Sequence, residues 1–159
     1  MGKFYAGIAE QLELYVRHAA WLHATPKDPE KPAKGAGMTR LVKFKRDEMA
    51  GKDPPELIFP EVDAGEYIVD WLFEVGPMIA GDPVTFQEIK AWRDLSGRVL
   101  DGWEATTLRR LSIAYTAEYH QASDPRTPAP GKTVAPKSAK QVSEGLAAAF
   151  ARLERGGRD

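Results

Sequence analysis

The chain has 159 residues, a net charge of −1 and no cysteine. This length predicts a single domain with a modest core, and the lack of cysteine excludes disulfides, thiolate metal sites and cysteine nucleophiles. The opening stretch GKFYAGIAEQLELYV carries charges among its apolar residues, so we expect neither a secretory signal nor a membrane span.

The charges are segregated along the chain. Residues 27–46 hold seven basic and two acidic side chains, whereas residues 47–88 hold eleven acidic and one basic. These two halves could attract each other. Because Phe44 is the only aromatic residue in the basic run, and the total charge offers little steering, nucleic acid is an unlikely partner and we interpret the run as a solvated linker.

Residues 1–23 are predicted to form an amphipathic helix. Apolar side chains recur three and four residues apart in the order Tyr5, Ile8, Leu12, Tyr15, Ala19 and Leu22. The run is too short for a free coiled coil. Its seam contacts either the rest of the chain or another protein copy, and we take Ile8, Leu12 and Tyr15 as candidate partner-binding residues.

Residues 24–61 are predicted to be a linker or insertion rich in proline and lysine. The stretch ATPKDPEKPAKGAG has no large apolar side chain to bury. Residues 39–49 fit a short strand or a helical turn or two equally well. Pro54, Pro55 and Pro60 then exclude a long element before Val62.

Residues 62–121 are predicted to form a helical core bundle. Its first helix starts at a capping box of Asp63 and Glu66 and ends at Gly76 and Pro77. A helical hairpin follows, with capping boxes at Thr85 with Glu88 and at Asp101 with Glu104, and with Gly97 as the left-handed stop between its helices. The stripe of Ile89, Trp92 and Leu95 should face a second stripe of Trp103, Leu108, Leu111, Tyr115 and Tyr119. The candidate core residues of the bundle are Tyr67, Trp71, Ile89, Trp92, Trp103, Leu108 and Leu111.

The C-terminal part is predicted to be a tethered helix. Residues 122–137 form a second proline-rich linker, and residues 138–159 an amphipathic helix that starts near Ser138 and Gln141. This helix either folds back on the chain or docks in a groove of another protein. Its candidate partner-binding residues are Val142, Leu146, Phe150 and Leu153.

We find no signature of catalysis or cofactor binding. His18 and His23 are five residues apart, which does not place them on one helical face as a metal pair requires. The chain has no glycine-rich phosphate loop and no nucleophilic serine motif. Acidic residues at 63, 66, 70 and 74 line a helix face, but capping and solvation explain them. We therefore expect no enzyme activity, no metal and no cofactor.

The hairpin leaves two arrangements open, an antiparallel pair or a helix-turn-helix that reads DNA. In the second case residues 102–107 would meet base edges. Glu104 would oppose phosphates there, and Trp103 is needed in the core, so DNA binding is the weaker alternative.

Three segments resemble the tail assembly chaperones that long-tailed bacteriophages encode beside the tape-measure gene. IAEQLELYVRHA resembles the opening helix of that family, EYIVDWLFEV its central aromatic helix, and TFQEIKAWRDLSGRVLDGWEATTLRRLSIAYTAEY its helical hairpin. Together they cover about half the chain. The insertion at residues 24–53 and the tethered last helix depart from the pattern of the family.

The resemblance implies a non-catalytic helical protein in the host cytoplasm that keeps the phage tape-measure protein soluble until tail-tube subunits assemble around it. It implies the tape-measure protein as partner, together with self-association and a possible contact with the tail-tube protein. The first alternative is a structural component of the tail or of the head-tail junction, which would remain in the virion.

Overall fold

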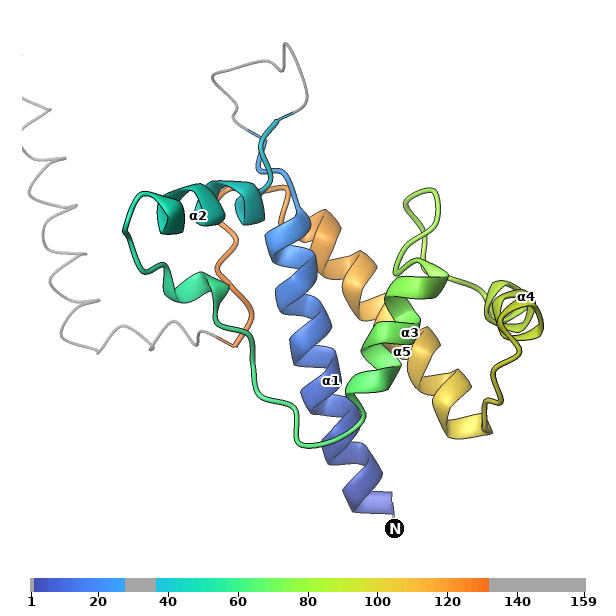
Figure 1. The fold of residues 1–159 in the computed structure, drawn as a ribbon. Helices are drawn as coiled ribbons and strands as arrows, with labels where there is room; N and C mark the ends of the chain where they lie inside the picture. Colours follow the sequence, from blue (N-terminus) through green and yellow to red (C-terminus); the bar gives the residue numbers. More distant parts are fainter. Residues whose placement is uncertain (1, 28–36, 132–159) are drawn as a thin grey trace, which may run out of the picture.

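The computed structural model describes residues 2–27 and 37–131, which fold into helices and contain no named strand. The elements are α1 (Gly2–His23), α2 (Arg40–Met49), the 3-10 helix η1 (Pro55–Leu57), α3 (Glu66–Val75), α4 (Phe86–Ser96) and α5 (Gly102–Gln121). Figure 1 shows α2 on one side of α1, with α3 and α4 on the other. The all-α prediction is confirmed for the described residues. The predicted helix at residues 138–159 lies outside them.

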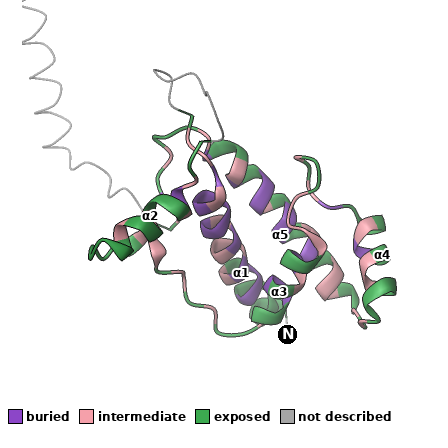
Figure 2. Ribbon diagram, turned by 45° about the horizontal axis from the view of Figure 1, so that its top comes forward, coloured by how far each residue is buried: buried purple, intermediate pink, exposed green. Residues whose placement is uncertain are grey.

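α1 lies at the centre of the core and not on its outside. Among the described elements, α1 and α5 form the most extensive contact. Ile8, Leu12 and Val16 on α1 are buried, and Figure 2 shows buried positions along both α1 and α5. These are the two longest helices, each about 30 Å long at 1.5 Å per residue, so their mutual contact buries the most apolar surface. The predicted bundle of residues 62–121 is therefore completed by α1.

The predicted core residues occupy three kinds of position. Ile89, Leu108 and Leu111 are buried. The three tryptophans at 71, 92 and 103 are half-buried and pack against the core cluster. Tyr67 differs from the prediction, because its side chain is 43% exposed. Its hydroxyl donates to Glu104 Oε1 at 2.9 Å, which holds the ring at the surface.

The local signals of the helical hairpin are confirmed. Thr85 and Glu88 form the capping box of α4, and Asp101 and Glu104 form that of α5. Gly97 ends α4 with a φ of 67°, in the left-handed region where glycine is favoured. Short-range chemistry alone fixes these three features, since every partner lies within four residues.

The predicted capping box at the start of α3 is wrong. Gly65, with a φ of 86°, precedes the helix, and no side chain caps it. The Asp63 carboxylate instead accepts a hydrogen bond from Gln11 Nε2 at 2.8 Å, and the Asp63 amide donates to Gln11 Oε1 at 3.1 Å. A contact with α1 therefore displaced the local cap.

Parts of both predicted linkers pack against α1. Residues 40–49 form α2, which settles the choice between strand and helix, and the prolines limit the next segment to η1. Residues 122–131 return along α1, where Trp21 Nε1 donates to the Thr127 carbonyl at 2.9 Å. A second apolar cluster joins these segments, consisting of Trp21, Leu22, Ala24, Ala122 and Ala129, with Leu41, Phe44, Phe59 and Tyr119 packed on it.

Arg40 is the polar centre of this second cluster. It is only 5% exposed, and its guanidinium lies 4.7 Å from the centre of the Trp21 ring. Nη1 donates to the carbonyls of Trp21 at 3.3 Å and Ala122 at 2.6 Å, and Nη2 donates to that of Asp124 at 3.1 Å. The Arg40 cation thus donates to one carbonyl in the last turn of α1 and to two in the segment that follows α5. The C-termini of helices leave such acceptors unpaired and carry partial negative charge.

Candidate protein-binding surface

An apolar groove lies between α4 and the end of α3. It has a volume of about 470 Å³ and is lined by Val75, Ile79, Glu88, Ala91, Trp92, Leu95 and Ser96. Five of these seven side chains are apolar. Leu95, which lines the groove, is 90% exposed, and Val99, in the loop after α4, is 89% exposed. These two residues and the groove together form what we call the α4 edge.

The α4 edge arises because the apolar stripe of α4 is longer than the surface available to cover it. Ile89, at the start of the helix, is buried, and Trp92, one turn later, is half-buried. Leu95 belongs to the same stripe, but it lies next to the end of the helix at Ser96, and no described element covers it. The stripe itself was visible in the sequence, whereas its uncovered end was not.

The Arg98 cation packs beside two tryptophan rings and fixes one wall of the groove. Trp71 and Trp92 have ring centres 5.9 Å apart, and the Arg98 guanidinium lies 5.4 Å from the first ring and 5.7 Å from the second. Arg98 Nη2 also donates to both carboxylate oxygens of Glu74, at 2.7 and 3.0 Å. Because α3 and the loop after α4 are joined in this way, the α4 edge is a preformed surface.

The structure does not place the predicted partner-binding residues of α1 at a free surface. Ile8 and Leu12 are buried between α1 and its neighbours, with 8% and 0% exposure. Tyr15 is half-buried, and its ring centre lies 4.7 Å from that of Phe59. The α1 seam thus contacts its own chain, which corrects its assignment as a surface open to partners. The other candidates, Val142, Leu146, Phe150 and Leu153, lie outside the described residues.

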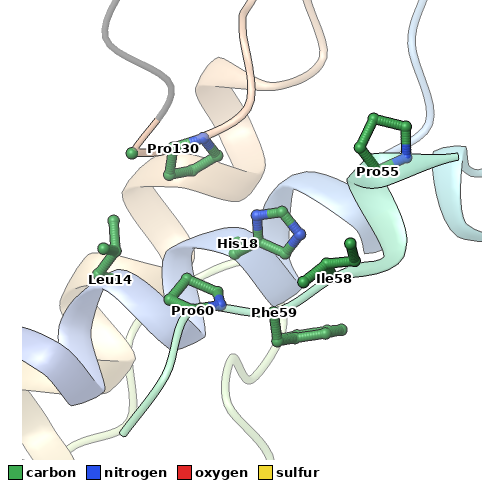
Figure 3. A pocket seen from close by; sticks show the side chains of 8 residues that line it. Leu14, His18, Pro55, Ile58, Phe59, Pro60 and Pro130 are labelled. Atoms are coloured by element: carbon green, nitrogen blue, oxygen red, sulfur yellow. The ribbon is translucent and has the colours of Figure 1, made fainter.

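A second pocket lies between α1, the segment that includes η1, and the end of the described chain (Figure 3). It has a volume of about 250 Å³ and is lined by Leu14, His18, Pro55, Ile58, Phe59, Pro60, Pro130 and Gly131. His18 is its only titratable side chain, and the lining contains no hydroxyl or carboxylate side chain. His18 Nε2 is 2.7 Å from the Glu56 carbonyl oxygen, and the ring packs edge-on against Phe59. This environment suits a structural histidine.

The pair of His23 and Tyr115 combines two neutral groups. His23 Nδ1 and the Tyr115 hydroxyl are 2.8 Å apart. Burial lowers the pKa of His23, and burial, with a smaller effect of Tyr119, raises the pKa of Tyr115 to about 12. At neutral pH the imidazole is therefore uncharged and the phenol keeps its proton, so their hydrogen bond joins α1 to α5 and generates no nucleophile.

Glu118 is a buried carboxylate with a structural partner. It is 4% exposed, and Arg17 Nε and Nη2 both donate to its Oε2, at 3.0 and 2.9 Å. Within residues 2–27 and 37–131, no group of three or more histidine or acidic side chains could hold a metal ion.

The cations of the hairpin, which a DNA-binding helix-turn-helix would use, have partners within the protein. Lys90 and Arg93 pair with Asp94, and Arg110 pairs with Glu13. Arg98 pairs with Glu74, and Arg109 donates to the carbonyl of Val84 at 2.6 Å. Glu104, at the expected reading position, caps α5 and binds Tyr67. Phosphate contacts by these cations would compete with the existing pairs.

In the part of the chain that the structure describes, no helix is both long enough and apolar enough to cross a membrane. Comparison with family models, with curated proteins and with solved structures found no match for this chain.

Proposed function

We propose that this protein is a tail assembly chaperone of a long-tailed bacteriophage, acting in the host cytoplasm on the tape-measure protein. The observation that supports this proposal is the α4 edge, a preformed apolar surface with two almost fully exposed aliphatic side chains. The ordered helical motifs that resemble the chaperone family point in the same direction. A tape-measure protein is long and helical, and its apolar stripes aggregate until the tail tube covers them.

The α4 edge has the properties that reversible binding of such a stripe requires. Burying Leu95 and Val99 against a partner helix would contribute about 1.5 to 3 kcal/mol each, before the cost of association is subtracted. A contact of this size is too weak to be permanent. The tail-tube protein, which covers the tape-measure protein along its length, could therefore displace the chaperone.

Co-expression with the tape-measure protein of the same phage tests the proposal. The wild-type chain should keep the partner in the soluble fraction and co-purify with it. The double variant Leu95→Asp/Val99→Asp should lose both effects, because a charged carboxylate cannot enter the apolar contact without a large desolvation cost. Ile113→Asp is the matched control, since Ile113 is 46% exposed on α5 and does not line the groove.

Two results would count against this function. If the double variant, shown by circular dichroism to be folded, still solubilises the tape-measure protein, then the α4 edge is not the binding surface. If mass spectrometry detects the protein in purified mature particles, it is a structural component of the tail or of the head-tail junction, because a transient chaperone leaves before maturation.

A further inference from the structure

The outer face of α2 is a basic apolar stripe. Leu41 and Phe44 point toward the second cluster, whereas Val42 and Met49 are exposed, by 52% and 88%. Lys45 and Arg46 lie between them in the sequence and are exposed as well. Spacings of three, four and seven residues place Val42, Lys45, Arg46 and Met49 on one side of the helix, which we call the α2 face.

The cations of the α2 face have no ion pair among the residues that the structure describes. The one salt bridge next to them joins Lys52 and Asp47. The acidic run at residues 47–88 therefore does not neutralise Lys45 and Arg46 within the described fold.

α3 carries a complementary acidic face. Glu66 and Asp70 are exposed one turn apart, and Phe73, 39% exposed, lies on the same side three residues later. Neither carboxylate forms a salt bridge with a described residue, in contrast to Glu74, which pairs with Arg98. We call Glu66, Asp70 and Phe73 the α3 face.

The two faces cannot meet within one molecule. α2 contacts α1 and η1, whereas α3 contacts α1, α4 and α5, and Figure 1 shows α2 and α3 on opposite sides of α1. We propose that the α2 face of one copy docks on the α3 face of a second copy. Lys45 and Arg46 then lie opposite Glu66 and Asp70, with Val42 and Met49 against Phe73.

This contact is heterologous, because the two faces lie on opposite sides of α1 and a single partner cannot cover both. The association then continues head to tail beyond a dimer, into a ring if the rotation between copies closes and into an open chain if it does not. Two single-helix faces form a small interface, which belongs to the weak and transient class. Because the charges are exposed, salt screens their attraction and the association weakens as ionic strength rises.

Sedimentation velocity of the purified full-length chain, without any tape-measure protein, tests this proposal separately from the chaperone function. At low salt, the weight-average mass should rise with concentration above the 17.6 kDa of one chain and should return toward it at high salt. A chain that stays monomeric at low salt and high concentration would overturn the proposal.

Charge reversal identifies the two faces. Lys45→Glu/Arg46→Glu and Glu66→Lys/Asp70→Lys should each weaken self-association about tenfold or more, because like charges then oppose each other. An equimolar mixture of the two variants should associate again, since the reversed α2 face of one fits the reversed α3 face of the other. Lys90→Glu/Arg93→Glu on α4 is the control and should associate like the wild type.

The mixture also distinguishes a second copy from a membrane. A basic apolar face that binds anionic lipid would lose vesicle binding in the Lys45→Glu/Arg46→Glu variant, but the α3 variant would have no effect on it. Circular dichroism shows that each variant is folded before it is used. Two folded variants that do not associate when mixed would refute the docking of α2 on α3.

Discussion

Replacing Arg40 by methionine should destabilise the protein strongly, although Arg40 does not belong to the main core cluster. Methionine keeps the apolar stem but removes the donors to the carbonyls of Trp21, Ala122 and Asp124. The Asp124 carbonyl still accepts from the Thr127 amide at 3.1 Å, so the carbonyls of Trp21 and Ala122 are the two that lose their partner. Each buried acceptor left without a partner costs about 1 to 3 kcal/mol, and the lost contact with Trp21 adds about 0.5 to 2 kcal/mol. Relief from burying a cation offsets part of this loss. We expect a net loss of about 3 kcal/mol, within the range for removing one member of a buried polar pair.

Urea unfolding at neutral pH, followed by tryptophan fluorescence, measures this loss. Arg46→Met on the same helix is the matched control, since Arg46 is exposed and has no ion pair with a described residue. The free energy of unfolding of the Arg46→Met variant should differ from that of the wild type by less than about 0.5 kcal/mol. Arg40→Lys should fall between the two, because an ammonium lacks the planar fork that reaches three acceptors. If Arg40→Met and Arg46→Met unfold at the same urea concentration, water serves those carbonyls and the reasoning is wrong.

Three further predictions concern stability. Ser112→Ala should lower the free energy of unfolding by about 1 to 3 kcal/mol in chemical unfolding. The buried Ser112 hydroxyl accepts from the Val84 amide at 2.8 Å and donates to the Pro77 carbonyl at 2.8 Å. Gly65→Ala should lower the free energy of unfolding by about 1 to 2 kcal/mol, because the φ of Gly65 is 86° and a Cβ there would lie 3.3 Å from side chains of α1. Gly102→Ala is the control and should be neutral or stabilising, because a Cβ at Gly102 would meet no atom within 4 Å. Burial lowers the pKa of His23 from 6.5, so the unfolded chain binds a proton at higher pH than the folded one. Stability should therefore be full above about pH 6.5 and fall with acidification, and His23→Asn should show a smaller fall.

The sequence predicted well where the deciding contacts are local. The capping boxes of α4 and α5 and the glycine stop between them depend on residues within one or two helical turns, and the structure has all of them. The amphipathic pattern of residues 3–23 likewise predicted α1. The all-α class follows from these local signals, although they did not distinguish helix from strand at residues 40–49, which form α2.

The predictions that failed concern which surfaces meet. Residues 40–49, which fit a short strand or a helical turn equally well, and the proline-rich residues 122–131 were placed in linker regions. Arg40 and Ala129 are nevertheless buried against partners more than eighty residues away. The candidate binding seam of Ile8 and Leu12 proved to be core, because α5 offered a surface of matching length. The uncovered end of the α4 stripe at Leu95 became apparent only from the fold.

Helical periodicity therefore determined from the sequence which side chains share a face, since the i to i+4 geometry is a property of the backbone itself. Whether a face is buried, exposed or paired with opposite charge was decided only by the tertiary structure. The free energy of such contacts comes from surfaces that are distant in sequence and become neighbours only when the chain folds.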